Sequence, residues 1–177
     1  MQAHRHVVPP LAERGRLVLD EEELREWGRE LGRSSAPPLM ITLTGDLGAG
    51  KTTLAQAICE GYGVEEPVTS PSYALVHRYS APASPVYHVD LYRLDNPAQL
   101  TNIGWDDMVS EHALIIVEWP ERAGPRIPED HLPIDIDWKL LRILGYVSVT
   151  LSILASIIPA RKAAKLEPID IIRKAEF

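Results

Sequence analysis

The amino-acid sequence predicts an α/β fold with a mostly parallel sheet, one antiparallel hairpin and an appended apolar helix near the C-terminal end. Leu39–Thr44 and Ala113–Val117 are short apolar runs, and a continuous apolar run such as the second is typical of a strand buried on both faces. Segments of helical composition alternate with these runs, which is the order found in layered α/β domains. Two further runs of alternating polarity, separated by a loop rich in Ser, Ala and Pro, favour the hairpin.

The first part of the chain contains two predicted helices that flank one strand. Asp20–Gly32 is predicted to be an amphipathic helix, because its apolar residues recur at helical spacing. Asp20 and Glu23 have the spacing of a capping box at its start. Leu39–Thr44 is the predicted strand, and Thr52–Glu60 is a second helix that glycines terminate.

The hairpin and a further helical segment follow. We expect the two hairpin strands at Tyr73–Tyr79 and Val86–Leu91. Asn96–Ser110 is predicted to be helical in part, with its asparagine as the N-cap in front of a proline. After the buried run at 113–117, Pro120–Pro133 is predicted to be a loop and Ile134–Asp137 one more strand.

Composition limits the possible functions. The chain has 177 residues, of which 45% are hydrophobic and 24% charged, and this excludes wholesale disorder. A single cysteine excludes a disulfide framework and fits the reducing cytoplasm, and the first residues lack the apolar core of a secretory signal. The formal net charge of −7 argues against unaided nucleic-acid binding, because phosphate contacts need clustered basic residues.

The charge is unevenly distributed along the chain. Residues 1–138 carry eleven basic against twenty-two acidic side chains, a net charge of −11, whereas residues 139–177 carry seven against three, a net charge of +4. Isoleucine is also concentrated in the last segment. The sequence therefore favours two segments of different origin, although any basic, apolar last helix would give the same pattern.

A phosphate-binding motif lies between the first strand and the second helix. Residues 45–52, GDLGAGKT, match G-x-x-x-x-G-K-[ST]. Gly45 permits the turn out of the strand, and Gly50 lets backbone N–H groups approach phosphate oxygens. Lys51, the only lysine among the first 138 residues, supplies a compact positive charge, and the Thr52 hydroxyl supplies a ligand for Mg²⁺.

A nucleotide site also needs an acidic residue at the end of a neighbouring strand to hold Mg²⁺. Glu118 follows the buried apolar run and is the better match to this pattern. Asp90 follows the second hairpin strand and is the other candidate. From the residues alone, both carboxylates stay open as the metal ligand.

Four stretches together resemble the TsaE family of small bacterial P-loop ATPases, which act in tRNA threonylcarbamoyladenosine (t6A37) biosynthesis. They are GDLGAGKTTL (45–54), VTSPSYALV (68–76), YHVDLYRL (87–94) and IVEWPE (116–121), and the resemblance extends from about residue 17 to 137. It implies a P-loop NTPase fold for a domain at 1–137. It also implies ATP and Mg²⁺ as cofactors and ATP hydrolysis as the activity.

The resemblance also implies roles for individual residues. Lys51, Asp90 and Glu118 would be catalytic, Thr52 and Glu118 would hold Mg²⁺, and Asp90 would lie by the γ-phosphate and the attacking water. The residues expected to contact the nucleotide are Gly45, Leu47, Gly48, Ala49, Gly50, Lys51, Thr52, Thr53, Thr69, Ser70, Asp90, Trp119 and Glu121. Thr69 and Ser70 would belong to a switch-like loop. His77 and His88 are interpreted as structural strand residues.

Members of this family act with two other proteins, a TsaD-like catalytic subunit and a TsaB-like companion. ATP hydrolysis would drive or reset that complex in the cytoplasm. The acidic body of the chain would repel tRNA, so contact with tRNA would be indirect, through the partners.

The C-terminal segment departs from the family pattern. Leu140–Ile158 is apolar, and the sequence after it is similar to the end of FtsX/LolE-type ABC-transporter permeases, which suggests a fusion. We expect residues 138–177 to form an apolar helix and a basic tail. A membrane contact through 140–158 is possible, but a true span is not expected, because an ATPase and a basic tail would both stay on the cytoplasmic side. Replacement of the usual C-terminal strand would impair ATPase activity.

Two other functions fit parts of the sequence. The chain would be a P-loop kinase for a small molecule if arginines reached the transferred phosphate, but residues 79–118 contain only Arg93. It would be a membrane-associated, non-enzymatic fusion fragment if the C-terminal segment dominated its behaviour.

Overall fold

A five-stranded sheet organises the part of the chain that the computed structural model describes, which is Gly15 and residues 17–137. Its strands are β1 (Leu39–Gly45), β2 (Val76–Tyr79), β3 (Val86–Asp90), β4 (Leu114–Glu118) and β5 (Leu132–Ile136), in the order β2-β3-β4-β1-β5. β3, β4, β1 and β5 are parallel, and β2 pairs antiparallel with β3. The predicted α/β class with a mostly parallel sheet and an antiparallel pair is confirmed.

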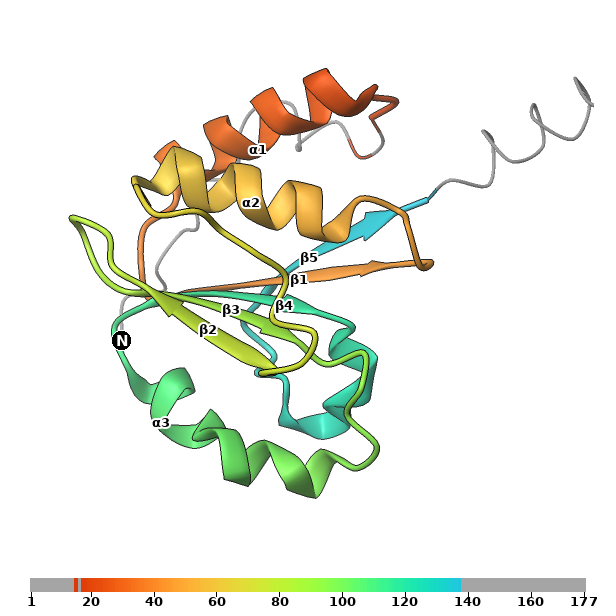
Figure 1. Cartoon of the computed structure of the whole chain (residues 1–177), viewed down its shortest axis with the longest axis vertical. Coiled ribbons are helices and arrows are strands. Elements are labelled where there is room, and N and C mark those ends of the chain that lie inside the picture. The colour runs from red at the N-terminus through yellow and green to blue at the C-terminus, as the bar shows by residue number, and fades with distance from the viewer. Residues whose placement is uncertain (1–14, 16, 138–177) are drawn as a thin grey trace, which may run out of the picture. The chain divides into compact units, whose positions relative to one another are not determined.

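Helices cover both faces of the sheet (Figure 1). α2 (Lys51–Tyr62) lies on one face, and α1 (Glu21–Ser34) packs over α2. The other face is covered by η2 (Pro97–Ile103) and α3 (Trp105–Ser110), with the short turns η3 (Pro120–Arg122) and η4 (Gly124–Arg126). Each face has its own apolar cluster, with Leu54 and Ile58 in the first and Leu100 and Trp105 in the second.

The start of α1 follows the predicted capping box. Asp20 accepts a hydrogen bond from the Glu23 backbone N–H at 2.9 Å, and the Glu23 carboxylate accepts one from the Asp20 N–H at 2.8 Å. These bonds satisfy two of the N–H groups that a helix start leaves without partners. The helix ends at Ser34 and not at Gly32 as expected, because Gly32 serves close packing and not termination.

Glycines let α1 and α2 approach closely. A Cβ atom at Gly28 would lie 2.7 Å from the Ala57 Cβ, and one at Gly32 would overlap the carbonyl oxygen of Ile58. From the other side, a Cβ at Gly61 would overlap the backbone of Arg29. The distance between the two helices is therefore set by backbone contact.

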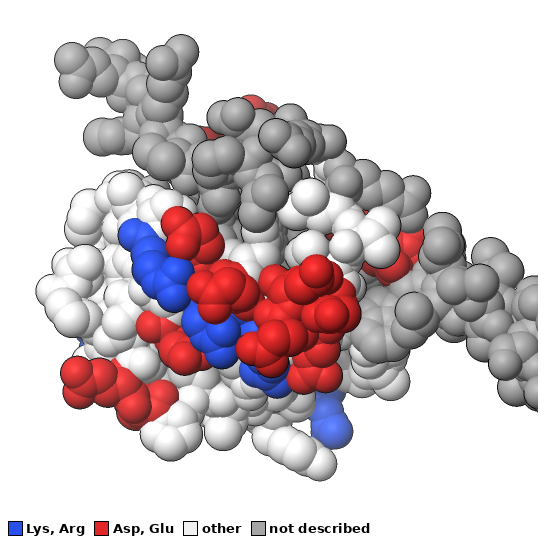
Figure 2. Space-filling view, turned by 90° about the horizontal axis from the view of Figure 1, so that it is seen from above, with Lys and Arg blue, Asp and Glu red and all other residues white. Residues whose placement is uncertain are grey.

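Arginines and glutamates alternate on the outer surface of α1 (Figure 2). Arg25 pairs with Glu21 at 3.0 Å, and Arg33 pairs with Glu30 at 2.8 Å. Arg29 lies 2.9 Å from Glu26, and through Glu60 it also links α1 to α2. Exposed pairs of this kind contribute little stability individually. α1 carries five glutamates against three arginines, so this face is acidic overall, as the composition predicts.

Other boundaries also differ from the prediction, three of them for a clear reason. β2 begins at Val76 and not at Tyr73, because Leu75 has a φ of 64° and cannot continue an extended strand. The segment 96–110 is divided at Gly104, which has a φ of 72°, so that a 3-10 helix precedes a short α-helix. The last strand spans Leu132–Ile136, and the expected loop before it contains the two turns η3 and η4.

The expected C-terminal helix, its likeness to a permease and the membrane contact through 140–158 fall on residues 138–177, outside the described part of the chain. The division of the chain at residue 137 likewise stays a prediction. Among the residues that the structure describes, no helix is both long and apolar enough to cross a membrane.

We expect Gly32→Ala to lower the free energy of unfolding by roughly 2 kcal/mol, because the new methyl group must displace the backbone of α2. In a helix without such a contact, the same change would raise the free energy of unfolding by up to about 1 kcal/mol. A decrease therefore identifies the backbone contact between the helices. Urea unfolding of the full chain, followed by circular dichroism, measures the effect. Arg33→Ala on the exposed face is the control, and equal or higher stability of Gly32→Ala would contradict the prediction.

Candidate functional site

The loop between β1 and α2 has the backbone of a phosphate cradle. Gly48 and Gly50 have φ values of 80° and 96°, in the left-handed region that favours glycine. Gly50 is the N-cap of α2, and no side chain caps the helix there. The N–H groups of the first turn and the positive end of the helix dipole therefore point into the loop, where they can bind an anion.

Lys51 is held at the centre of this loop. Its Nζ donates to the carbonyl oxygens of Gly45 at 2.7 Å and Asp46 at 2.8 Å, and lies 3.8 Å from the centre of the Trp119 ring. Only 4% of Lys51 is exposed. Burial lowers the pKa of its ammonium group, while the carboxylates of Glu118 and Glu121 oppose that shift.

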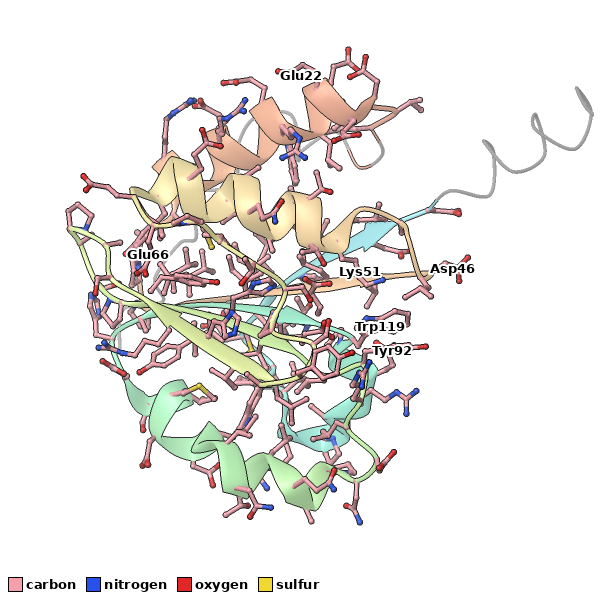
Figure 3. All side chains as sticks on the ribbon, viewed as in Figure 1. Glu22, Asp46, Lys51, Glu66, Tyr92 and Trp119 are labelled. Carbon is pink, nitrogen blue, oxygen red and sulfur yellow. The ribbon has the colours of Figure 1, made fainter. Side chains whose placement is uncertain are left out.

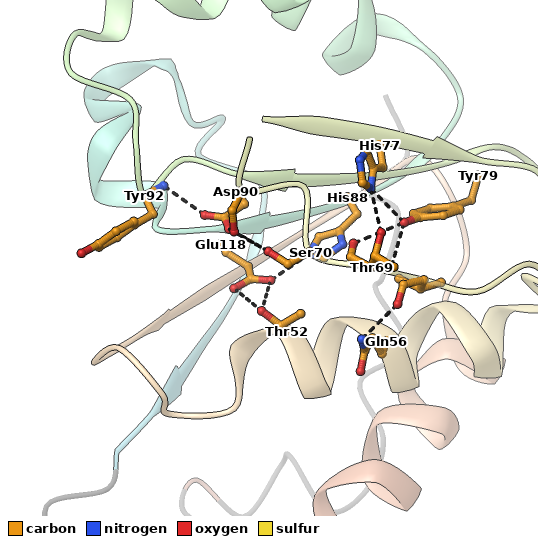
Figure 4. Close-up of polar contacts among 12 residues, drawn as sticks. Thr52, Gln56, Thr69, Ser70, His77, Tyr79, His88, Asp90, Tyr92 and Glu118 are labelled. Atoms are coloured by element: carbon orange, nitrogen blue, oxygen red, sulfur yellow. Dashed lines mark hydrogen bonds and ion pairs between the residues drawn. The ribbon is translucent and has the colours of Figure 1, made fainter. Parts of the chain in front are cut away.

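Glu118, the last residue of β4, contacts the first turn of α2 through its side chain. The Thr52 hydroxyl donates to the two Glu118 carboxylate oxygens, at 3.0 and 3.1 Å. The Nε2 of His88, on β3, lies 2.8 Å from Glu118 Oε1 in a fully buried contact. A hydroxyl and a carboxylate, whose oxygen atoms can both coordinate a metal, thus face each other beside the phosphate cradle (Figure 4).

Asp90 lies directly beside Glu118 in the sheet, because β3 and β4 pair in parallel with these two residues in register. Its Oδ2 accepts hydrogen bonds from Ser70 at 3.1 Å and Ser72 at 2.8 Å, and its Oδ1 accepts one from the Tyr92 N–H at 3.0 Å. Asp90 is 4% exposed and Glu118 is 2% exposed. Each buried carboxylate is therefore satisfied by a different set of donors.

The segment around Thr69 is attached to the domain at several points (Figure 4). Gln56 on α2 donates to the Val68 carbonyl oxygen at 2.9 Å. The Tyr79 hydroxyl accepts a hydrogen bond from the Thr69 N–H at 3.1 Å, and His77 lies 3.4 Å from the Thr69 hydroxyl. The loop that carries Ser70 to Asp90 is thus held by side chains of α2 and β2.

These residues enclose a pocket of about 270 Å³. Its lining consists of Leu47, Gly48, Ala49, Gly50, Lys51, Thr52, Thr53, Ser70, Ser72, Asp90, Tyr92, Glu118 and Trp119. Figure 3 shows Lys51, Tyr92 and Trp119 close together at this end of the sheet. The ring centres of Tyr92 and Trp119 lie 5.0 Å apart, and the two rings form an apolar wall beside the lysine.

Most of the residues predicted for the site line this pocket, but three do not. Gly45 contributes its carbonyl oxygen to Lys51, and Thr69 lies behind Ser70 on the attached loop. Glu121 is exposed on η3 and does not line the pocket, but its negative charge acts on the ammonium group of Lys51. Ser72 and Tyr92 were missed, although both belong to stretches that carry the family resemblance.

The donor set is suited to Mg²⁺ bound together with a nucleotide. Thr52 and Glu118 present hard oxygen atoms that could serve as ligands, with Asp90 beside them. Mg²⁺ commonly takes one or two carboxylates and completes its shell with phosphate oxygens and water. The described residues contain no cluster of three or more His, Cys, Asp or Glu side chains that would enclose a metal alone. The open glycine cradle beside these oxygens fits phosphate groups.

Comparison with known proteins decides the family. The family model for "Threonylcarbamoyl adenosine biosynthesis protein TsaE" matches residues 18–142. The chain belongs to the TsaE family. The Haemophilus influenzae protein named tRNA threonylcarbamoyladenosine biosynthesis protein TsaE is 39% identical over 126 residues, which are 68% of this chain and 80% of that protein. The Bacillus subtilis protein of the same name is 30% identical over 119 residues, 67% of this chain and 74% of that protein.

A solved structure agrees with this assignment. The crystal structure of Bacillus subtilis YdiB superposes with a TM-score of 0.56 at 28% sequence identity, and covers 67% of this chain and 72% of that one. The match supports the P-loop NTPase type of α/β fold for the TsaE region. These comparisons give no support to the permease likeness of the C-terminal segment.

We expect Tyr79→Phe to loosen the loop around Thr69, because it removes the hydroxyl that accepts a hydrogen bond from the Thr69 N–H. Loss of a hydrogen bond worth about 1 kcal/mol corresponds to roughly fivefold faster amide exchange at Thr69. Hydrogen exchange followed by NMR measures this rate. Tyr87→Phe, which loses its hydroxyl contacts to Arg78 and Glu111 on the other side of the sheet, is the matched control. Equal exchange at Thr69 in both variants would be evidence against the proposed attachment.

Proposed function

We propose that this TsaE-family chain binds and hydrolyses ATP with Mg²⁺, and that hydrolysis supports tRNA threonylcarbamoyladenosine biosynthesis in the cytoplasm. The observation that carries the proposal is the contact between Thr52 and Glu118 beside the glycine loop. In this contact, two side chains that could hold a metal lie next to each other beside a loop suited to bind phosphate. The relatives are named for this biosynthetic route, and that supports the second part of the proposal.

The loop and Lys51 would bind the phosphates. The N–H groups of the first turn of α2 are directed into the loop, and Lys51 Nζ would exchange the carbonyl oxygens of Gly45 and Asp46 for phosphate oxygens. Trp119 and Tyr92 would cover the same side of the pocket and exclude water from the lysine.

Thr52 and Glu118 would hold Mg²⁺, and Asp90 would orient the attacking water. When bound, Mg²⁺ neutralises the charge that develops on the phosphate oxygens. Asp90 is suited to its role because Ser70, Ser72 and the Tyr92 N–H fix its carboxylate in place. The loop that carries both serines would couple the state of the nucleotide to the surface of the domain.

The chain would act within a complex with TsaD-like and TsaB-like proteins. The net charge of −11 over residues 1–138 disfavours direct contact with tRNA. ATP hydrolysis by this chain would therefore drive or reset a complex in which another subunit transfers the threonylcarbamoyl group. A chain with this role would hydrolyse ATP slowly on its own.

We expect Lys51→Ala and Glu118→Gln to lower the rate of ATP hydrolysis by roughly 100- to 1,000-fold, because each removes a group that stabilises charge at the phosphates. Release of inorganic phosphate by the full chain measures the rate. Glu65→Gln, an exposed carboxylate outside the pocket, is the charge-matched control. Wild-type rates in both site variants would refute the ATPase proposal, and phosphate transfer to a metabolite would favour a kinase instead.

We expect the full chain to capture the TsaD-like and TsaB-like proteins of the same organism more strongly with ATP than without it. The nucleotide would stabilise the loop at Ser70 and Ser72, and this loop would form part of the surface that senses the partners. A pull-down with purified proteins measures the capture, and Lys51→Ala should remove the dependence on ATP. Failure of the wild-type chain to bind either protein would contradict the partner proposal and leave the ATPase proposal standing.

A further inference from the structure

His88 is a buried polar residue that the proposed ATPase mechanism does not yet use. It lies in the middle of β3 and is fully buried, two residues before Asp90 and on the same face of the sheet. Its register partner on β4 is Ile116, so its ring reaches diagonally to Glu118 at the end of that strand.

The two nitrogens of the His88 ring have unequal surroundings. Nε2 lies 2.8 Å from Glu118 Oε1, whereas Nδ1 is buried and has no hydrogen-bond partner among the described residues. An ionised carboxylate only accepts hydrogen bonds, so this contact assigns the proton to Nε2. An apolar side chain would avoid the cost of the unpaired Nδ1. Packing alone is therefore a poor reason for a histidine here.

Glu118 has two side-chain donors in the described part of the chain, Thr52 and His88. Thr52 is also a proposed metal ligand, so its hydroxyl oxygen is shared with the cation. His88 is the donor that the cation does not engage. We propose that His88 is a positioning residue, which holds Glu118 Oε1 and so fixes the orientation of the carboxylate toward Thr52 and Mg²⁺.

His77 lies on the same face of the sheet as His88 but has no contact with Glu118 among the described residues, so a histidine on this face is not sufficient for the contact. It is paired with His88 across β2 and β3, so both rings are on the same face of the sheet. His77 is only half-buried, and its Nδ1 lies near the Thr69 and Tyr79 hydroxyl groups. The contact with Glu118 is specific to His88. It depends on the register of β3 against β4.

Outer-shell donors of this kind change metal affinity or activity by about 10- to 100-fold when they are removed. This inference rests on the proposed function, because it concerns the same Mg²⁺ site. A pair of amide substitutions separates positioning from packing. In His88→Gln the amide nitrogen can occupy the place of Nε2, whereas in His88→Asn it can reach only the place of Nδ1.

The experiment compares the full-length wild type, His88→Asn and His88→Gln in two measurements. The first is the Mg²⁺ concentration that gives half-maximal ATP hydrolysis. The second is the affinity for a non-hydrolysable ATP analogue, measured by calorimetry with Mg²⁺ and with EDTA. We expect His88→Asn to need about 10- to 100-fold more Mg²⁺ and to bind the analogue normally in EDTA, and His88→Gln to stay within about threefold of wild type in both.

Tyr62→Phe is the control for stability, because it removes a buried hydrogen bond to Ser84 far from the pocket. It should leave the Mg²⁺ dependence unchanged, even if its thermal unfolding temperature falls as far as that of His88→Asn. Wild-type Mg²⁺ dependence in His88→Asn would overturn the proposal, as would equal impairment in both His88 variants. If His88→Asn does not fold, loss of Mg²⁺ affinity in a folded His88→Gln overturns it, and retention supports it. A wild-type chain that neither binds the analogue nor hydrolyses ATP would instead contradict the proposed function.

Discussion

The hydrogen bond between Thr52 and Glu118 connects the two halves of the site, and the site depends on it. Thr52 is on the first turn of α2, after the glycine loop, whereas Glu118 ends β4, 66 residues later in the chain. Parallel pairing makes this contact possible, since the carboxyl ends of parallel strands meet at one edge of a sheet. Leu43 on β1 and Asp90 on β3 are both in register with Glu118. The loop after β1 and the carboxylates of Asp90 and Glu118 therefore lie at the same edge of the sheet.

The packing of α1 on α2 supports this arrangement from outside the site. Gly28, Gly32 and Gly61 allow backbone contact between the helices, which leaves α2 little freedom to shift along its axis. Leu24 at the other end of α1 lies near the glycine loop, because a Cβ at Gly50 would be 3.5 Å from its Cδ2. The first helix therefore holds both the direction of α2 and the outer side of the phosphate cradle, although it contributes no residue to the pocket.

Local patterns predicted the parts of the fold that depend on local physics. The capping box at Asp20, the strand at Leu39 and the glycine loop were all readable, because each depends on residues close in sequence. The residues alone left both Asp90 and Glu118 open as the metal ligand, because their relative position depends on strand register. The register places the two side by side. Ser72 was not predicted, because the positive φ of Leu75 turns the chain and directs the preceding segment to Asp90. The alternating polarity of residues 73–79 gave no sign of that turn. His88 was correctly interpreted as a strand residue, but its contact with Glu118 also depends on register.

The charges of the pocket link the two ligands that we propose for it. Asp90 and Glu118 are buried side by side, and Lys51 is the positively charged side chain in the pocket lining. A nucleotide without metal would meet two carboxylates that repel its phosphates, and a metal without nucleotide would find few ligands in the protein. Each therefore relieves the unfavourable charge that the other would meet. Since hydrogen bonds from Ser70 and Ser72 to Asp90, and from His88 to Glu118, fix the carboxylates in advance, metal and nucleotide gain most by binding together.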